Sequence, residues 1–209
     1  MPLLHRADVL DGAIALLDAE GLDGLTTRKL GASLNIDGSA LYRHFPNKEA
    51  LLDAIADRLV EGVDETLPDT SWDVQLTTLG GRLREALLRH RDGARIVAGT
   101  YAAGPNTRLV SRTIFDVLER GGVTAERAGW IAFALAHYVL GHTIDEQARA
   151  ELAASKAWQA KLTDLVEQSD NAYVAAAIEA TFAADPAERF GYGLRAFLDG
   201  IRRELDVPA

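Results

Sequence analysis

Residues 26–48, TTRKLGASLNIDGSALYRHFPNK, decide the fold of this chain. The stretch opens with Thr26 and Thr27, and either hydroxyl can cap a short helix by accepting a bond from an unpaired backbone N–H. Leu30 and Leu34 lie four residues apart, so they share one face of that helix and point toward a core. The stretch therefore begins with a short helix that buries one face.

Turn residues end this helix, and a second helix follows. Residues 35–38, Asn-Ile-Asp-Gly, favour a tight turn. The pattern then predicts a short helix over about 38–44, and Pro46 and Asn47 end it and cap the next helix. Two short helices joined by a tight turn are typical of a helix-turn-helix unit.

Longer helices flank this pair. The first is predicted over about 6–19, with an apolar stripe that stops at Gly21. The helix after Asn47 has Glu49 in its first turn, where a carboxylate interacts favourably with the helix dipole. Its inner side carries Leu51, Leu52, Ile55, Leu59 and Val63. Three compact helices are thus predicted to lead into a long connecting helix.

The remainder of the 209 residues also has a helical period, and no stretch alternates like a strand for long. Helical patterns continue at about 72–90, 93–99, 105–120, 124–150, 156–167, 171–183 and 186–204. We therefore predict an all-α protein. Its expected domains are a helix-turn-helix head over 1–48, a connecting helix over 49–66 and a larger helical domain over 67–209.

Charge narrows the class of function. The formal net charge of −9 argues against broad, non-specific nucleic-acid binding. The stretch quoted above nevertheless holds Arg28, Lys29, Arg43 and Lys48 against Asp37 alone. A small basic patch on an acidic protein suits a specific DNA reader, because the acidic remainder disfavours wrong orientations on the DNA.

Composition excludes several kinds of chemistry. The chain has no cysteine, so disulfides, thiolate metal sites and cysteine nucleophiles are excluded. It has neither an apolar run of about 18 residues nor an N-terminal export signal. We therefore expect a cytoplasmic protein with no membrane partner.

Two motifs of the head, TTRKL at 26–30 and LYRHFPNKEALL at 41–52, closely resemble the tetracycline-repressor (TetR) family of transcriptional regulators. The resemblance continues at His90-Arg91-Asp92-Gly93-Ala94, Gly99-Thr100, His137-Tyr138, Leu140-Gly141 and Asp145-Glu146-Gln147. It implies a homodimeric repressor that binds a palindromic operator in double-stranded DNA and is released by a small-molecule effector. The head would bind DNA, and the domain over 67–209 would bind the effector and form the dimer.

The helix over 38–44 is expected to lie in the major groove, which is wide enough for an α-helix. Tyr42 offers a ring and a hydroxyl, and Arg28 can reach a guanine edge. Thr27 and Lys48 can reach phosphates. The predicted DNA-binding residues are Thr27, Arg28, Gly38, Ser39, Ala40, Tyr42, Arg43, His44 and Lys48.

The alternative for these positions is an ordinary role in a three-helix bundle. We expect Leu41 and Phe45 to be core residues. Tyr42 follows one position after Leu41 and precedes Phe45 by three, so it has room to point outward.

The resemblance also concerns the effector. In the tetracycline repressors, a histidine shortly after the His-Arg-Asp-Gly run binds a magnesium ion that the drug carries. Val97 occupies that position here, which argues against a tetracycline–magnesium ligand, and no metal or cofactor is expected. We predict a pocket of mixed character, since apolar walls with a few polar groups suit a small molecule. Its predicted lining is Leu83, Val97, Thr100, Tyr101, Phe115, Trp130, Phe133, His137 and Asp145, with core positions as the alternative for the phenylalanines.

The last predicted helix carries a continuous apolar stripe. The stripe consists of Phe190, Leu194, Phe197, Ile201 and Leu205. The resemblance implies that this helix and the helix over 124–150 form a four-helix dimer interface across a two-fold axis. The alternative is a stripe that packs only on its own chain.

An enzyme is the alternative from another class. His142, Asp145 and Glu146 share one helix face and could bind a metal weakly, and His90 and Asp92 are further candidates. The sequence has no Gly-rich phosphate loop, no nucleophile elbow and no second histidine at zinc-site spacing. We therefore predict a regulator and not an enzyme.

Overall fold

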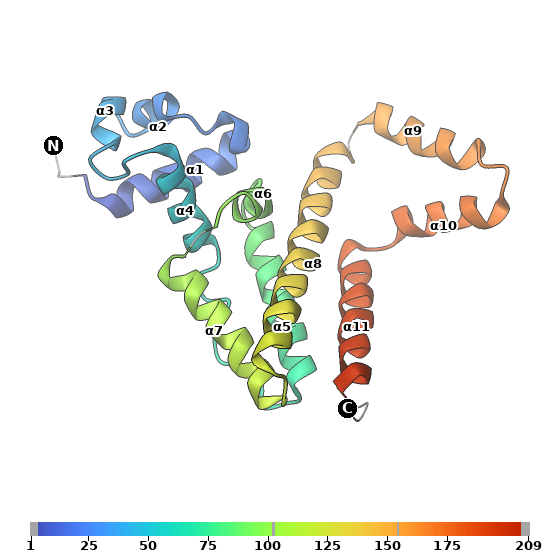
Figure 1. Ribbon diagram of the computed structural model, residues 1–209. Helices are drawn as coiled ribbons and strands as arrows, with labels where there is room; N and C mark the ends of the chain where they lie inside the picture. The colour runs from blue at the N-terminus through green and yellow to red at the C-terminus, as the bar shows by residue number, and fades with distance from the viewer. Residues whose placement is uncertain (1–3, 102, 154, 206–209) are drawn as a thin grey trace. The chain divides into compact units, whose positions relative to one another are not determined.

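The computed structural model describes residues 4–101, 103–153 and 155–205, which form eleven α-helices and no strand (Figure 1). The predicted all-α fold is confirmed. No helix among these residues is long and apolar enough to cross a membrane. The helices are α1 (Arg6–Gly24), α2 (Thr27–Ser33), α3 (Gly38–Leu41), α4 (Lys48–Leu59), α5 (Trp72–Leu88), α6 (Gly93–Ala98), α7 (Pro105–Arg120), α8 (Ala125–Leu152), α9 (Lys156–Glu167), α10 (Ala172–Ala183) and α11 (Pro186–Leu205).

The chain divides into two compact units. The first ends at Ile144 and the second begins at Asp145, so the boundary falls inside α8. The first unit holds the head, α1 to α3, and the connecting helix α4, which packs in the core of the head, together with α5, α6 and α7. The second holds α9, α10 and α11. The domain boundaries predicted after residues 48 and 66 fall within the first unit and stay predictions.

The head is a small bundle around one apolar core. Leu17 of α1, Leu30 of α2 and Ile55 of α4 are completely buried, and Leu41 of α3 and Phe45 are buried in the same cluster. Burying such a side chain contributes about 1.5–3 kcal/mol. Helices as short as α2 and α3 are not stable alone in water, so this shared core holds them in place.

Side-chain caps start the helices α2, α3 and α4. The Thr26 hydroxyl accepts a 3.2 Å bond from a backbone amide of α2, and the Asn47 side chain accepts a 2.8 Å bond from a backbone amide of α4. At α3, the Asp37 carboxylate accepts a 2.7 Å bond from the Ser39 amide. The Ser39 hydroxyl and amide hold the pKa of Asp37 below its ordinary value, so this cap stays charged at neutral pH.

Three helix ends differ from the sequence predictions. α3 stops at Leu41, and residues 42–44 continue as a turn whose amides bond to carbonyls three residues back. α1 continues past Gly21, which has φ 74° and ψ 176° and interrupts the regular helix. α4 ends at Leu59, because the chain turns at Gly62 with φ 79°.

The turn between α2 and α3 depends on the missing side chain of Gly31. Its carbonyl accepts a 2.9 Å bond from the Ile36 amide, and Asn35 takes a left-handed conformation with φ 54°. A Cβ on Gly31 would lie 3.0 Å from the Ile36 oxygen and 3.2 Å from the Cα of Gly38. The first residue of α3 therefore packs directly on the backbone of α2.

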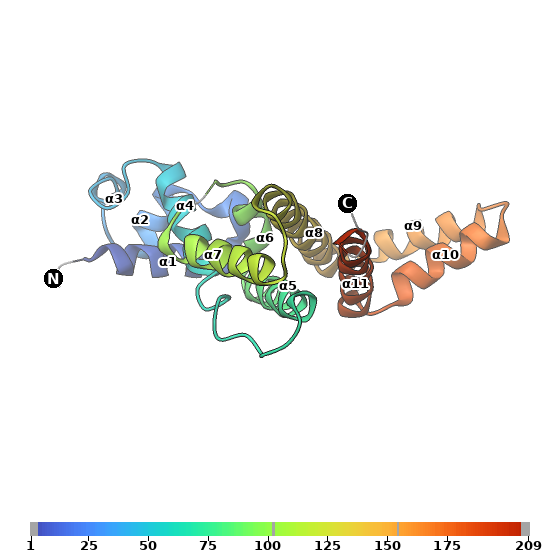
Figure 2. The ribbon, with the colours of Figure 1, turned by 60° about the horizontal axis from the view of Figure 1, so that its bottom comes forward.

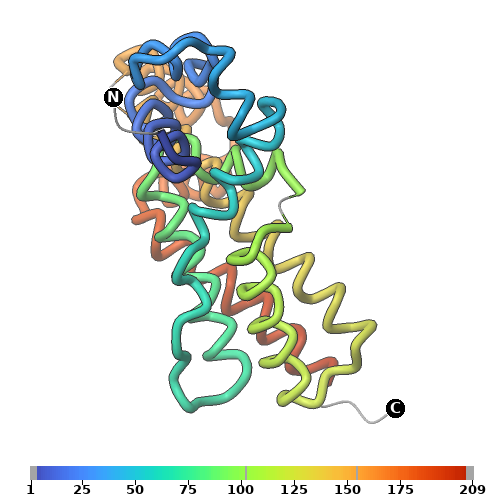
Figure 3. The backbone as a smooth tube through the Cα atoms, turned by 90° about the vertical axis from the view of Figure 1, so that its left-hand side faces the viewer, coloured from blue at the N-terminus to red at the C-terminus, as the bar shows by residue number. Residues whose placement is uncertain are grey.

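The helices α5 to α7 complete the first unit. α5 packs against α7, as Figure 2 shows, and Leu79 and Val117 on these helices are buried. The turn-rich segment 60–71 leads from α4 back to α5, as the tube in Figure 3 shows. Arg82 of α5 holds this segment by donating a 2.6 Å bond to the Glu65 carbonyl.

The second unit contains a helical hairpin and one long amphipathic helix. α9 and α10 lie side by side (Figures 1 and 2), and the rings of Trp158 and Phe182 meet edge to face with centroids 6.2 Å apart. Neither helix buries a side chain. In α11, Phe190, Leu194 and Leu198 are buried, so part of the predicted stripe is already covered within one chain.

The close approach at Gly31 generates a stability prediction. Gly31→Ala should lower the free energy of unfolding by about 1–3 kcal/mol, because the new methyl group forces α3 away from α2. Urea denaturation followed by circular dichroism measures this change. The control is Gly81→Ala in α5, where a Cβ would meet nothing within 4 Å. That control should stabilise the chain by about 0.5–1 kcal/mol through helix propensity, and equal effects of the two substitutions would contradict the prediction.

Candidate DNA-binding surface and ligand cavity

The predicted DNA-binding residues surround an outward face of α3. Leu41 and Phe45 are buried, whereas the Tyr42 side chain is 54% exposed. The core thus holds one side of α3 and the turn after it, and leaves the other side open to solvent. Within the predicted set, Arg28, Ser39, Tyr42, Arg43 and Lys48 are exposed, and Thr27, Gly38, Ala40 and His44 are half-buried.

Three cations of this surface have no ion-pair partner among the described residues. They are Arg28, Arg43 and Lys48. Lys29, the fourth cation of the basic stretch, pairs instead with Glu20 of α1. Unpaired guanidinium and ammonium groups have donors available for phosphate oxygens and guanine edges. The surface therefore has the charge that DNA binding requires, although the whole chain is acidic.

A carboxylate holds the head to the turn before α6. Asp92, in a left-handed conformation with φ 57°, accepts a 2.8 Å bond from the Leu22 amide at the end of α1. Burial alone would raise the pKa of Asp92, but the Leu22 amide and the Arg95 and Arg91 guanidinium groups keep it below its ordinary value. A Cβ on Gly21 would lie 2.9 Å from this carboxylate, so α1 is interrupted where Asp92 contacts it.

An open cavity of about 840 Å³ lies along α7, and the side chains of Leu109 and Phe115 in its wall are 49% and 44% exposed. Its lining is Ala103, Pro105, Thr107, Arg108, Leu109, Ser111, Arg112 and Phe115. Small-molecule sites have volumes of about 300–1,000 Å³ and combine apolar walls with a few polar groups. Leu109 and Phe115 supply apolar walls here, and Arg108 and Arg112 supply two guanidinium groups. The cavity can therefore hold a partly apolar small molecule.

Phe115 is the only predicted ligand-binding residue among the described lining residues of this cavity. Trp130 and Phe133 lie on α8, and each side chain is 66% exposed. The His137 ring packs on Phe133 with centroids 4.0 Å apart, and its Nδ1 lies 2.7 Å from the Phe133 carbonyl oxygen. Tyr101 is fully exposed. These aromatic side chains form accessible surface on the single chain.

The other predicted ligand-binding residues have neighbours of a different kind. Leu83 and Val97 are partly buried against the core of the head. The Thr100 hydroxyl donates a 3.4 Å bond to the Val97 carbonyl. Asp145 belongs to the second unit, where one of its oxygens lies 2.6 Å from Nε of Arg149. The assignment of all nine residues to one pocket stays a prediction.

Reasoning from the sequence missed Thr107, Arg108 and Arg112 as cavity residues. Arg108 and Arg112 lie four apart and share a face of α7, which was an available signal. That spacing is also typical of a solvated helix face, so the sequence alone could not distinguish the two roles.

The residues considered for an enzyme do not form a metal centre. Within residues 4–101, 103–153 and 155–205, no group of three or more His, Asp or Glu side chains is placed to hold a metal ion. His90 lies 3.0 Å from Asp18 of α1, and Asp92 accepts the bond from α1 described above. The structure therefore does not support the metal-dependent enzyme built on His142, Asp145 and Glu146.

Comparison with known families covers both the head and the larger helical part. Residues 9–55 match the family model described as bacterial regulatory proteins, tetR family. Residues 66–205 match the model of the tetracyclin repressor-like C-terminal domain. The chain belongs to the TetR family. As a TetR-family protein it is a transcriptional regulator and not an enzyme.

TetR-family relatives match along nearly the whole chain. The class A tetracycline repressor of Escherichia coli is 36% identical over 99% of this chain and 95% of its own length. A crystal structure of a possible TetR family transcriptional regulator from Streptomyces coelicolor A3(2) has a TM-score of 0.87 at 35% identity, covering 95% of this chain and 99% of that one. A TetR variant from Acinetobacter baumannii AYE in complex with minocycline has a TM-score of 0.73 at 32% identity, over 96% and 98% of the two chains.

The exposed cations of the head generate a DNA-binding prediction. Lys48→Ala should weaken binding to all sequences alike and reduce the slope of log K against log salt by about 2, as expected when each protomer of a dimer loses one phosphate contact. Arg28→Ala should reduce the free energy of DNA binding by roughly 1–3 kcal/mol for each half-site. It should also relax the sequence preference, since a bidentate base contact is lost. Fluorescence anisotropy with DNA selected by the unmutated protein measures both effects. The control is Lys161→Ala on α9, an exposed cation outside the head. Losses equal to those of the control would contradict the assignment.

Proposed function

We propose that this TetR-family chain is a ligand-responsive transcriptional repressor that binds a palindromic operator as a homodimer and leaves it when a small molecule binds. The observation that carries the proposal is the arrangement around α3. Buried Leu41 and Phe45 fix this segment in the head, and exposed Tyr42 with unpaired Arg28, Arg43 and Lys48 leaves one side suited to DNA.

The proposed reading of DNA combines shape with charge. Ser39 is exposed, and Gly38 and Ala40 beside it are half-buried, so their small side chains let the backbone of α3 approach base edges closely. The long side chains of Arg28 and Lys48 would reach the phosphates and bases on either side. A two-fold dimer would place two such surfaces in successive major grooves, about one helical turn apart or slightly more.

The proposed dimer involves α11. Phe190 and Leu194 are buried within the single chain, but Phe197 and Ile201 on the same stripe are only half-buried. Covering this remaining apolar surface favours association. In a C2 dimer the same surface on each chain would pack against its copy.

The proposed effector is partly apolar and binds without a metal. The cavity along α7 offers Leu109 and Phe115 for contact with an apolar or aromatic group. Arg108 and Arg112 can interact with an electronegative group on the same molecule. Val97 stands where the resemblance places the magnesium-binding histidine of the tetracycline repressors, so a different ligand is expected.

Selection of bound sequences from random or genomic DNA with the purified protein tests the proposal as a whole. Enrichment of a palindrome, with binding that weakens steeply with salt, is the expected result. A screen of metabolites should then yield a compound that raises the melting temperature and frees the selected DNA. No enriched DNA sequence would refute the DNA-binding part, and no active compound in a broad screen would argue against the effector.

The half-buried part of the α11 stripe generates a prediction about association. Phe197→Asp with Ile201→Asp should convert the dimer to a monomer, because burying two carboxylates at the interface is unfavourable. Light scattering gives the mass, and helical circular dichroism shows that the chain stays folded. Operator affinity should fall at the same time. The two heads are then no longer linked, so binding of one half-site does not raise the effective concentration of a head at the other. Ala196→Asp, at an exposed position of α11, adds the same type of charge and should leave the dimer intact, and a monomeric unmutated protein would refute the proposed assembly.

The replacement at Val97 generates a prediction about tetracycline. Tetracycline with magnesium should neither bind this protein tightly nor release its operator. Drug fluorescence and operator anisotropy measure these two effects, with and without a chelator. The class A tetracycline repressor serves as the positive control. The prediction would be refuted if tetracycline released the operator and a chelator abolished that release, because the site would then bind the drug–metal complex.

A further inference from the structure

Asp57 is the one charged side chain among the buried residues that the structure describes, with 8% of its surface exposed. A buried carboxylate is unfavourable unless hydrogen bonds replace its lost hydration. Asp57 lies near the end of α4, the helix that leads out of the head. Its hydrogen-bond partners therefore identify the element that is attached to this end of α4.

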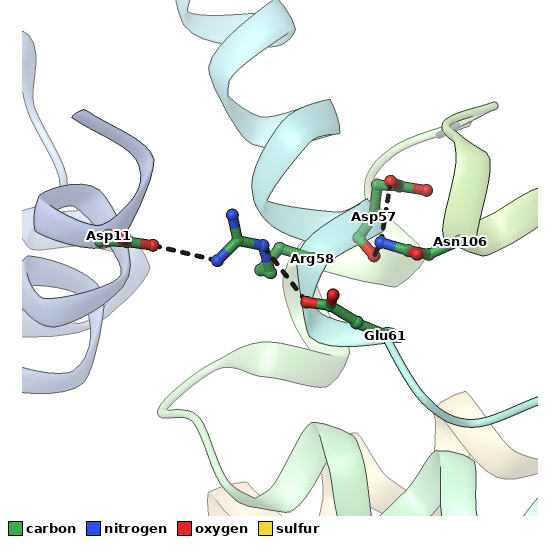
Figure 4. A network of polar contacts seen from close by, with 5 residues as sticks. All are labelled: Asp11, Asp57, Arg58, Glu61 and Asn106. Atoms are coloured by element: carbon green, nitrogen blue, oxygen red, sulfur yellow. Dashed lines mark hydrogen bonds and ion pairs between the residues drawn. The ribbon is translucent and has the colours of Figure 1, made fainter. Parts of the chain in front are cut away.

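Both partners of Asp57 lie in the first turn of α7. Its Oδ1 accepts bonds of 2.9 Å from the Thr107 amide and 2.9 Å from the Thr107 hydroxyl. Asn106 Nδ2 donates to Oδ2 at 3.3 Å and to the Asp57 carbonyl at 3.1 Å (Figure 4). The cap position of α7 is Gly104, which has no side chain to cap the helix. Asp57 thus supplies the N-terminal cap of α7 from a different helix, where a negative charge is favourable.

Gly104 leaves the space that the carboxylate occupies. A Cβ at this position would lie 2.2 Å from Cγ of Asp57 and 2.3 Å from its Oδ1. Its φ of −69° is open to any residue, so the requirement is space and not backbone conformation. Any larger residue at 104 would push the Asp57 side chain away from the end of α7.

The neighbour of Asp57 holds the other side of α4. Arg58 donates a 3.0 Å bond to Asp11 of α1 and lies 3.4 Å from Glu61 (Figure 4). Two consecutive residues of α4 therefore connect this helix to α1 on one side and to α7 on the other. The Arg58 pairs are exposed to solvent and weak. The hydrogen bonds of Asp57 are partly buried and, among the described residues, four in number, so Asp57 is the firmer connection.

Thr107 connects this cap to the cavity. It donates two bonds to Asp57, and it also lines the cavity along α7. A molecule that shifts Thr107 must also shift or break the bonds to Asp57, since both bonds come from this one residue. Displacement of the first turn of α7 would therefore reach α4 and the head directly.

We infer that Asp57 is a positioning residue for induction, which transmits the state of the cavity along α7 to the DNA-binding head through its cap on α7. The inference rests on the proposed function, because it assigns the coupling residue of the proposed repressor. Coupling between two sites is reciprocal. Operator binding to the head must therefore also change the stability of the first turns of α7.

Hydrogen exchange on the full-length protein measures this reciprocal effect without an effector. The probe is the operator obtained by DNA selection, and the measured amides are those of residues 107–111. Operator binding should slow their exchange by about fivefold or more in the unmutated protein, in line with typical coupling between sites. Asp57→Ala should abolish this slowing and weaken operator binding roughly tenfold, as expected for loss of a coupling of ordinary size. Asp57→Asn, which keeps the shape and an acceptor oxygen, should retain part of both effects.

Gly104→Ala provides an independent variant, because it displaces the carboxylate without altering α4. Like Asp57→Ala, it should abolish the slowing of exchange at residues 107–111 and weaken operator binding. Gly81→Ala on α5, where a Cβ would meet nothing within 4 Å, is the matched control, and its operator binding and exchange should match those of the unmutated protein.

Two results would overturn the inference in distinguishable ways. If Asp57 only stabilises the fold, the melting temperature falls in Asp57→Ala and Gly104→Ala, but operator binding still slows exchange at residues 107–111. If the unmutated protein enriches no DNA in the selection, the proposed repressor function fails, and the coupling role fails with it.

Discussion

A four-residue helix has almost no stability of its own, and the candidate DNA-binding surface of this protein is built around one. α3 forms because Leu41 and Phe45 are buried in the core of the head, Asp37 caps its start, and Gly31 leaves room for its first residue. Together these three features hold α3 in an orientation that leaves Tyr42 exposed. Tertiary packing therefore sets the geometry of the candidate DNA-binding surface.

The helices of the head could be predicted from sequence because their signals are local. Threonine and asparagine caps, apolar spacing and turn residues lie within a few positions of the helix ends that they determine. The interruption at Gly21 has a distant cause, since Asp92 contacts α1 from far along the chain. Asp57 was missed for the same reason, because Thr107 is fifty residues away and nothing local marks Asp57 as a cap.

The cavity along α7 was harder to predict from sequence than the exposed side of α3. Its described lining residues all lie on α7 and the segment directly before it, and the sequence of one helix does not show how much open space is left beside that helix. Phe115 is the one predicted ligand-binding residue among its described lining residues, whereas Arg108 and Arg112 have the spacing of a solvated helix face. Trp130 and Phe133 remain exposed on the single chain, so their burial depends on molecules that a single sequence does not specify.

Asp57 and Arg58 are consecutive residues, and their contacts with α7 and α1 fix the rotation of α4 about its own axis, which is its phase. Consecutive residues on an α-helix differ by about 100° in direction, which is why one contacts α7 and the other contacts α1. Inserting or deleting one residue earlier in α4 would turn both side chains away from their partners. A chimera that joins this head to another regulator's body must therefore preserve the register of α4 as well as its length. Exposed residues of the head can change without disturbing this junction, whereas an insertion or deletion in α4 preserves it only if the helix returns to the same phase.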